Sequence, residues 1–175
     1  MDNLALFFLI FGMSNKSNLL DFAMIFGAEY VIFITFFLIF VFALKGKIKE
    51  KKALLLSLLS IPIVVLLIKG IHLFFFEPRP FITYDISPLI TYSRIDASFP
   101  SRHSALMFAI AFSFIFYKSR LGVVFSFLAL WVGISRIYVG VHYPIDILGG
   151  IIVALIAVYL GWIIKGKLKS RLLST

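Results

Sequence analysis

Long apolar runs, separated by short polar clusters, constrain this chain more than any other feature of its sequence. Four runs have the roughly 20 residues that a helix needs to cross about 30 Å of hydrocarbon: Leu19–Leu44, Ala53–Phe76, Leu121–Gly140 and Ile145–Ile164. Two further runs are shorter, Leu4–Met13 and Ala105–Tyr117. Because backbone polar groups must be satisfied inside a bilayer, such runs fold as helices. We therefore predict an all-α, polytopic membrane helical bundle with six transmembrane segments, forming one domain over residues 1–175.

The composition agrees with a lipid environment. Hydrophobic residues make up 62% of the chain and charged residues 14%, against about 45–50% and about 25% in soluble domains. The absence of cysteine excludes a disulfide scaffold, thiolate catalysis and a cysteine-ligated metal. A net charge of +9 without a soluble basic domain does not indicate nucleic-acid binding. We expect the bilayer as a partner, with no cofactor, no metal and no protein partner.

The distribution of Lys and Arg predicts the orientation in the membrane. If the segments alternate in direction, Lys45–Lys52, Lys118–Arg120 and Lys165–Arg171 share one face and hold 11 of the 17 basic residues. Such an excess marks the cytoplasmic side. We predict a multi-pass protein of the inner (cytoplasmic) membrane, with these loops and the C-terminus in the cytoplasm. The opposite face then points outward.

The residues able to do chemistry concentrate on or near that outward face. Ionisable groups near membrane depth are costly, so their default interpretation is functional. The set contains all three histidines and four cationic side chains: His72, His103, His142, Lys69, Arg79, Arg102 and Arg136. Because three separate stretches converge on one side of a small bundle, we predict a shared site there.

Two local patterns suggest the chemistry. Ser101 is placed to act as the N-cap of the helix that contains His103, and free N–H groups at such a start bind anions. Asp146 follows His142 by four residues, in the first turn of a helix that Pro144 begins. An aspartate so placed accepts the proton of one imidazole nitrogen and leaves the other as a nucleophile.

Three motifs with these residues resemble the signature of the type-2 phosphatidic acid phosphatase family, Lys-x6-Arg-Pro, Pro-Ser-Gly-His and Ser-Arg-x5-His-x3-Asp. The third motif is complete from Ser135-Arg136 through His142 to Asp146. The second reads Pro100-Ser101-Arg102-His103, with arginine in place of glycine. The first keeps Arg79-Pro80, but His72 stands where the family has lysine, and Lys69 lies one helical turn earlier.

The resemblance implies a mechanism for this chain. His142 attacks phosphorus and forms a phosphohistidine, while Asp146 orients it. His103 protonates the leaving oxygen and then activates water. The phosphoryl oxygens are held by a separate group of residues: Arg79, Arg136, Ser101, Arg102 and, with alternative assignments, Lys69 and His72.

Within the family, the sequence is most similar to the undecaprenyl-diphosphate phosphatases of the bacitracin-resistance type. The similarity includes Ala28-Glu29-Tyr30, Glu77–Phe81, Asp96–Ser101 and Gly133–Gly140. It implies cleavage of undecaprenyl diphosphate to undecaprenyl phosphate and phosphate, in recycling of the cell-wall lipid carrier. Phosphatidylglycerophosphate, phosphatidic acid and lipid A 1-phosphate are alternative substrates, with the lipid recognised by loop 81–99 and helix surfaces.

Several alternatives stay open at this stage. His72 lines the site or hydrogen-bonds within it, and Lys69 contacts phosphate or extends to the membrane interface. Glu29 is costly inside an apolar run and has no evident partner. Arg94, Asp85 and Asp96 are expected as solvated loop charges, with substrate contact as the alternative. Two other classes compete with the phosphatase, namely a metal-dependent membrane hydrolase and a non-enzymatic anion binder or transporter; the nearby cations argue against a metal.

Overall fold

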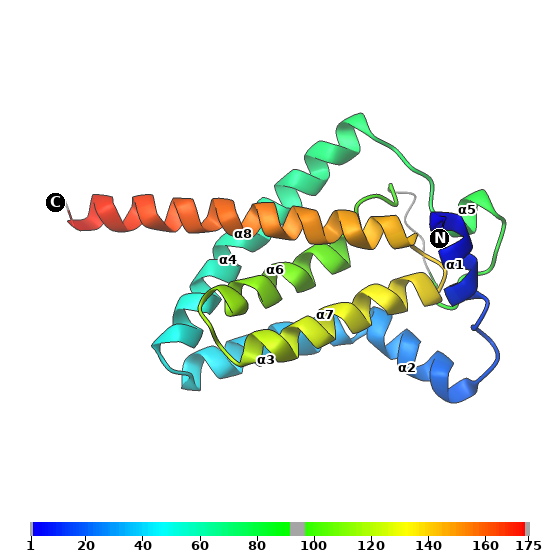
Figure 1. The fold of residues 1–175 in the computed structure, drawn as a ribbon, viewed down its shortest axis with the longest axis horizontal. Helices are drawn as coiled ribbons and strands as arrows, with labels where there is room; N and C mark the ends of the chain where they lie inside the picture. Colours follow the sequence, from blue (N-terminus) through cyan, green and yellow to red (C-terminus); the bar gives the residue numbers. More distant parts are fainter. Residues whose placement is uncertain (1, 92–96, 174–175) are drawn as a thin grey trace.

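The computed structural model describes residues 2–91 and 97–173, apart from the side chains of residues 43, 44 and 168–173. These residues form helices and no strand (Figure 1): α1 (Asn3–Phe11), α2 (Asn18–Glu29), α3 (Val31–Lys45), α4 (Ile48–Phe74), α5 (Pro80–Thr83), α6 (Arg102–Phe116), α7 (Leu121–Tyr138) and α8 (Pro144–Leu173). Each of the six predicted apolar runs is therefore helical. The all-α prediction is confirmed for the described residues.

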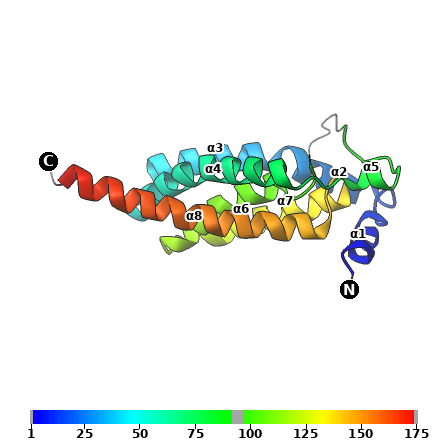
Figure 2. The same cartoon turned by 90° about the horizontal axis from the view of Figure 1, so that it is seen from above.

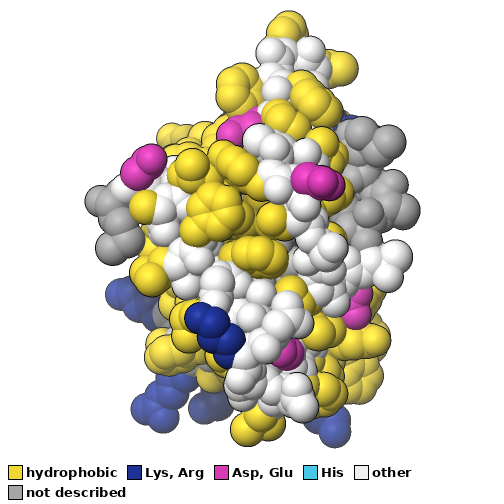
Figure 3. All heavy atoms as spheres, turned by 90° about the vertical axis from the view of Figure 1, so that its right-hand side faces the viewer, with side chains coloured by type: hydrophobic (Ala, Val, Ile, Leu, Met, Phe, Trp, Pro, Cys, Tyr) yellow, Lys and Arg dark blue, Asp and Glu magenta, His cyan; other side chains and the backbone are white. Residues whose placement is uncertain are grey.

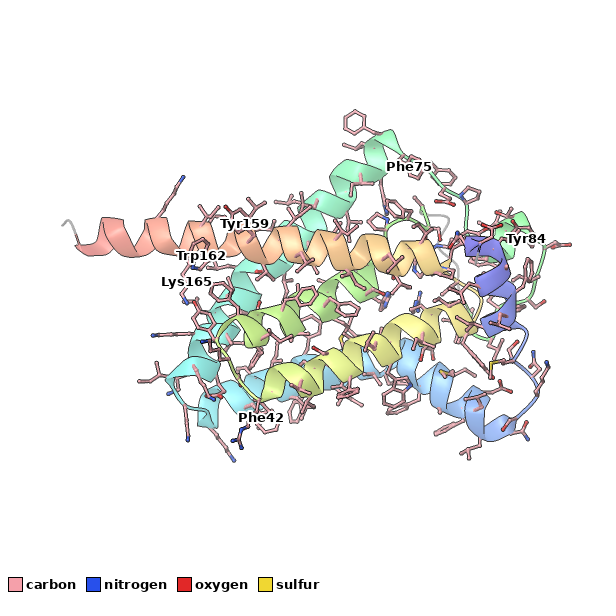
Figure 4. The ribbon with its side chains drawn as sticks, in the orientation of Figure 1. Phe42, Phe75, Tyr84, Tyr159, Trp162 and Lys165 are labelled. Carbon is pink, nitrogen blue, oxygen red and sulfur yellow. The ribbon has the colours of Figure 1, made fainter. Side chains whose placement is uncertain are left out.

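The long helices run back and forth along one axis, and α3 and α4 lie above α7 and α8 in the view of Figure 2. The end of α4, the start of α6 and the α7–α8 turn lie toward one end of the bundle, which we call the histidine end (His72, His103 and His142). The α3–α4 and α6–α7 connections lie at the other end, which we call the lysine end (Lys45–Lys52 and Lys118–Arg120). Figure 4 labels Tyr84 at the histidine end and Phe42 at the lysine end.

Helix α6 is the centre of the bundle and packs against α4, α7 and α8. Most of its side chains are buried, including Met107, Ile110 and Phe114, and small residues such as Ala109 allow close approach of its neighbours. Its 15 residues rise only about 22 Å, less than the hydrocarbon thickness. Because other helices surround it, its ends do not need to reach the lipid boundary.

Three helices are long and apolar enough to cross a membrane: α4, α7 and residues 144–167 of α8. Helices α2 and α3 add a fourth if the bent pair is counted as one span. These are the four runs that the sequence predicts to be long enough. The six-span prediction is not settled by this result, because α1 and α6 are too short by themselves.

The run Leu19–Leu44, expected as one span, is divided into two helices that differ in direction by 56°. The break lies at Tyr30. Before it, α2 packs against α7; after it, α3 packs mainly against α4. Gly27 makes the first contact possible, since a Cβ there would lie 2.7 Å from the Trp131 ring nitrogen. The bend therefore lets α2 pack against α7 while α3 packs against α4.

Candidate active site

A tight turn between α7 and α8 presents His142. Gly140 adopts a φ of +85°, which other residues rarely adopt, and a Cβ there would lie 2.9 Å from the Phe11 ring of α1. Helix α8 begins at Pro144 and carries Asp146 in its first turn, as predicted. Helix α1 also caps α8, because the Asn3 side-chain oxygen accepts from the Ile145 N–H at 3.0 Å. The short N-terminal helix thus holds the turn that carries the predicted nucleophile.

Asp146 receives three hydrogen bonds on a single carboxylate oxygen. Its Oδ2 lies 3.1 Å from His142 Nδ1, 2.5 Å from the Ser98 hydroxyl and 2.8 Å from the Tyr143 backbone N–H. Both His142 and Asp146 are buried, with exposed fractions of 2% and 0%. The pair predicted from the i, i+4 spacing is therefore formed, and its geometry is fixed from three directions.

Arg79 lies against the other nitrogen of the same imidazole. Its Nη1 is 3.0 Å from His142 Nε2 and 2.9 Å from the Val141 carbonyl, while Nη2 donates to the Ala97 carbonyl at 3.3 Å. The guanidinium is 2% exposed. A buried arginine in this position is therefore directed at the atom that would attack phosphorus.

The protonation of His142 follows from its two neighbours. A guanidinium only donates, so Nε2 beside Arg79 must accept. The imidazole proton then lies on Nδ1 and is donated to Asp146. In this tautomer the Nε2 lone pair is the hydrogen-bond acceptor that faces the Arg79 guanidinium.

The start of α6 is joined directly to α8. The Ser101 N–H donates to the Asp146 carbonyl at 2.9 Å, and Gly150 allows this approach because a Cβ there would lie 2.8 Å from the Ser101 carbonyl oxygen. Ser101 occupies the N-cap position as predicted, but its side chain does not cap the helix. Its buried hydroxyl instead accepts from the Ser104 hydroxyl at 3.2 Å. The predicted N-cap position of Ser101 is therefore confirmed, and its hydroxyl makes no cap hydrogen bond.

A cavity of about 680 Å³ opens beside this junction. Its polar wall contains Glu29, Arg102, His103 and Arg136. Its apolar wall comes mainly from α3 and α6, with Ile32, Phe33, Phe36 and Leu106. One cavity thus combines cationic and imidazole groups with a surface suited to a hydrocarbon chain.

Arg136 reaches this cavity from α7 and is 2% exposed. Its Nη1 donates to the Ala28 carbonyl at 3.4 Å, in the last turn of α2. Glu29 is the next residue along and lines the same cavity. The location of Glu29 inside an apolar run is therefore explained, since it faces a polar cavity at the α2–α3 bend.

Two further predicted phosphate-binding residues, Lys69 and His72, lie on α4. Lys69 is exposed on α4, and His72 is partly buried one turn closer to its end. A role of either residue in phosphate binding stays a prediction. Arg94 and Asp96, and with them the centre of loop 81–99, lie outside the described residues, whereas Asp85 is exposed.

Ser98 is a site residue that the sequence analysis missed. Besides its bond to Asp146, its hydroxyl lies 3.4 Å from His142 Nδ1, and its N–H donates to the Glu77 carbonyl at 2.8 Å. Phe99 next to it packs edge-on against Phe75, labelled in Figure 4. A serine three residues before Ser101 carries no spacing signal of its own, and only the tertiary structure reveals it.

The environment of Glu77 is electrostatically unfavourable for a carboxylate. Burial, and secondarily the charge of Asp146, raise the pKa of Glu77 above its ordinary value. Glu77 lies in the connection between α4 and α5 and lines a smaller cavity of about 250 Å³ with Thr83 and Tyr143. The histidine end therefore contains two carboxylates, of Glu77 and Asp146, close enough to affect each other.

The surface of this end hides the reactive groups. Figure 3 views the molecule from this side and shows apolar side chains, scattered acidic and basic groups, and no histidine on the visible face of the described residues. Among those residues, no group of three or more His, Cys, Asp or Glu side chains is placed to hold a metal ion. The buried donors instead match the oxygens of an anion.

Residues 50–170 match the PAP2 superfamily. The chain is 34% identical over 158 residues to undecaprenyl-diphosphatase BcrC of Bacillus subtilis (strain 168). The aligned region covers 90% of this chain and 81% of that protein. It is also 35% identical over 68 residues to lipid A 1-phosphatase of Rhizobium johnstonii, covering 39% of this chain and 28% of the relative.

Two solved structures have a similar fold. LpxE of Aquifex aeolicus superimposes with a TM-score of 0.70 at 29% identity, covering 91% of this chain and 94% of that chain. A transmembrane PAP2 type phosphatidylglycerolphosphate phosphatase of Bacillus subtilis superimposes with a TM-score of 0.53 at 24% identity, covering 94% of both chains.

Proposed function

This chain belongs to the PAP2 superfamily and is an integral-membrane lipid phosphatase, and we propose that it converts undecaprenyl diphosphate to undecaprenyl phosphate and phosphate. The observation that carries the proposal is the orientation of His142, with Nδ1 on Asp146 and Nε2 on Arg79. The similarity to undecaprenyl-diphosphatase BcrC over 90% of the chain supports the choice of substrate.

The first step forms a phosphohistidine. The terminal phosphoryl group displaces His142 Nε2 from Arg79 and accepts hydrogen bonds from Arg79 and Arg136, whose planar forks match its oxygens. The Nε2 lone pair attacks phosphorus, and the bond to the bridging oxygen breaks. His103 gives its proton to that oxygen, which leaves as undecaprenyl phosphate.

The second step releases phosphate. Neutral His103 takes a proton from water, the resulting hydroxide attacks phosphorus, and the P–N bond breaks to restore His142. Asp146 stabilises the imidazolium character that develops on His142 in both steps. Ser101 and Arg102 add hydrogen bonds to the phosphoryl oxygens. Catalysis of phosphoryl transfer depends chiefly on such positioning and charge stabilisation.

The cavity beside His103 fits a lipid diphosphate. Arg102, His103 and Arg136 form its charged wall, and the α3–α6 side provides an apolar wall. A polyisoprenoid chain would lie along Phe33 and Phe36 while its diphosphate meets the arginines. We extend the proposal to topology: six membrane segments, with the histidine end facing outward and the lysine end in the cytoplasm of a bacterial cell.

A panel of lipids tests the substrate. Purified protein in detergent is given undecaprenyl diphosphate, phosphatidylglycerophosphate, phosphatidic acid and lipid A 1-phosphate, and phosphate release is measured for each. We expect the largest kcat/KM with undecaprenyl diphosphate, inhibition by vanadate and activity that survives EDTA. A preference for lipid A would instead favour the function named for the Rhizobium relative, and complete loss with EDTA would contradict the metal-independent mechanism.

A further inference from the structure

A second cavity, of about 550 Å³, lies at the lysine end of the bundle. Four cationic side chains line it, and they come from three separate places in the chain: Lys45 at the end of α3, Lys47 and Lys49 at the start of α4, and Arg120 before α7. Glu50 is the acidic residue of the lining. Its walls therefore carry a formal charge of 4 − 1 = +3.

Hydrogen bonds join the two sides of this cavity, the start of α4 and the α6–α7 connection. The Ser119 hydroxyl donates to Glu50 Oε1 at 3.0 Å and accepts from the Leu121 N–H at 3.3 Å. Lys49 donates to the Lys118 carbonyl at 3.4 Å. Glu50 is 8% exposed, so its carboxylate is a structural connection between the start of α4 and the α6–α7 connection. These contacts fix Glu50 and Lys49, whereas Lys45, Lys47 and Arg120 are exposed around the hollow.

Helix direction adds to the positive potential. Lys47 is the N-cap of α4, which has 27 residues, and Arg120 is the N-cap of α7, which has 18. Both helix N-termini carry partial positive charge and lie beside the same cavity. The orientation rule accounts for many lysines at this end, but not for their convergence with two helix starts on one hollow.

We propose that this cavity is a second anion site, which binds the phosphate group of an anionic lipid headgroup at the end of the bundle opposite the catalytic histidines. Phe42 lines it and is labelled in Figure 4 far from Tyr84. Its apolar ring offers a surface for the upper acyl chain, while Lys47, Lys49 and Arg120 surround the phosphate. The proposal is independent of hydrolysis, because none of these residues belongs to the catalytic cluster.

Native mass spectrometry from nanodiscs tests the site. The unmodified protein is released from phosphatidylcholine nanodiscs with and without 30% phosphatidylglycerol, and the fraction that retains one phosphatidylglycerol is measured. The cavity pair Lys47→Gln and Arg120→Gln is compared with the control pair Lys51→Gln and Lys52→Gln. The control removes the same charge from two exposed positions of α4 that do not line the cavity.

We expect retention to fall at least fivefold in the cavity pair and to stay within twofold of the unmodified protein in the control pair. Equal loss in both pairs, or full retention in the cavity pair, would overturn the proposal. Phosphate release from undecaprenyl diphosphate in both variants confirms folding. If the cavity pair fails to fold, amide hydrogen exchange of the unmodified protein decides: phosphatidylglycerol must slow exchange at residues 45–50 and 118–121, and unchanged exchange refutes the site.

A third arm identifies the source of the phosphate group. Inorganic phosphate at 10 mM is added to the unmodified protein that carries phosphatidylglycerol. If phosphate displaces the lipid, the site recognises the phosphate group alone. If the lipid is retained, the site recognises the intact headgroup.

Discussion

The two ends of this bundle use positive charge in opposite ways. At the histidine end, Arg79 and Arg136 are each 2% exposed and are held by backbone carbonyls of distant segments. At the lysine end, Lys45, Lys47 and Arg120 are exposed around a hollow. The first arrangement fixes each donor at one position, whereas the second leaves the side chains free to adapt to a ligand.

The difference teaches that the net charge of a membrane protein says little about its chemistry. Most of the +9 of the sequence lies at the lysine end and in Lys165–Arg171, where single side chains contribute weakly in water. The histidine end is close to neutral in sum, yet its buried cations interact strongly because little water screens them. Substitutions at the two ends should therefore differ greatly in effect.

Replacement of His142 by alanine is the change with the largest expected effect. Loss of the nucleophile should reduce kcat for undecaprenyl diphosphate by more than about 10⁴-fold. Single-turnover reaction with substrate labelled at the terminal phosphate should give an acid-labile labelled protein before the substitution and none after it. Near-normal hydrolysis by the alanine variant would refute the assigned role.

An Arg-to-Lys change at each end makes the comparison direct. Arg79→Lys removes a fork that contacts two carbonyls and the imidazole, and we expect kcat/KM to fall by about 10²–10³-fold. Arg120→Lys at the lysine end keeps the charge on an exposed side chain and should leave kcat/KM within about twofold. Equal effects would remove the distinction between buried and exposed cations.

Ser98→Ala tests whether the support of Asp146 matters. Loss of a hydrogen bond to a buried carboxylate costs about 1.5–3 kcal/mol, so we expect kcat to fall by about 10–100-fold. Because Ser98 acts through Asp146 and His142, the loss should appear in kcat with KM little changed, and the pH profile of kcat should shift. A threonine at this position should restore part of the activity, whereas a purely structural defect would lower Tm without that rescue.

Glu77→Gln tests the carboxylate beside the catalytic cluster. Burial and the charge of Asp146 raise the pKa of Glu77, so its ionisation disfavours the folded state as the pH rises through that pKa. Glutamine cannot ionise, so the variant does not lose this folding stability as the pH rises. We expect a small increase in Tm at neutral pH that disappears below about pH 4.5, the ordinary pKa of the group. An increase that is the same at every pH would contradict the electrostatic cause.

The smallest effect is expected for Lys51→Gln with Lys52→Gln. Both side chains are exposed on α4 and line no described cavity at the lysine end. Activity should stay within about twofold and stability within about 0.5 kcal/mol. A large loss of activity would show that the lysine end influences catalysis.

The sequence predicted the helices well because segments embedded in lipid must be both apolar and helical, so the apolar runs mark them directly. It also predicted the His142–Asp146 pair, since an i, i+4 spacing across a helix start determines the geometry locally. The α2–α3 bend at Tyr30 was missed, because no proline stands there and the cause is packing against α7 and α4.

Long-range hydrogen bonds account for the other misses. Ser98 reaches Asp146 across 48 positions, and Arg136 reaches the Ala28 carbonyl across 108. No local pattern encodes either contact. Ser101 lies at the N-cap as predicted, and its hydroxyl accepts from the Ser104 hydroxyl without capping the helix.

The shortness of α6 has a consequence for how a lipid reaches the enzyme. With 15 residues, α6 is about 8 Å shorter than the hydrocarbon layer is thick. If its end beside Lys118 is level with one boundary, His103 at its start lies below the opposite boundary. A phosphate that anchors its lipid at the membrane surface then needs to sink only slightly to meet the histidine. The whole chain of the lipid can stay in the bilayer, and substrate and product exchange by lateral diffusion within the leaflet.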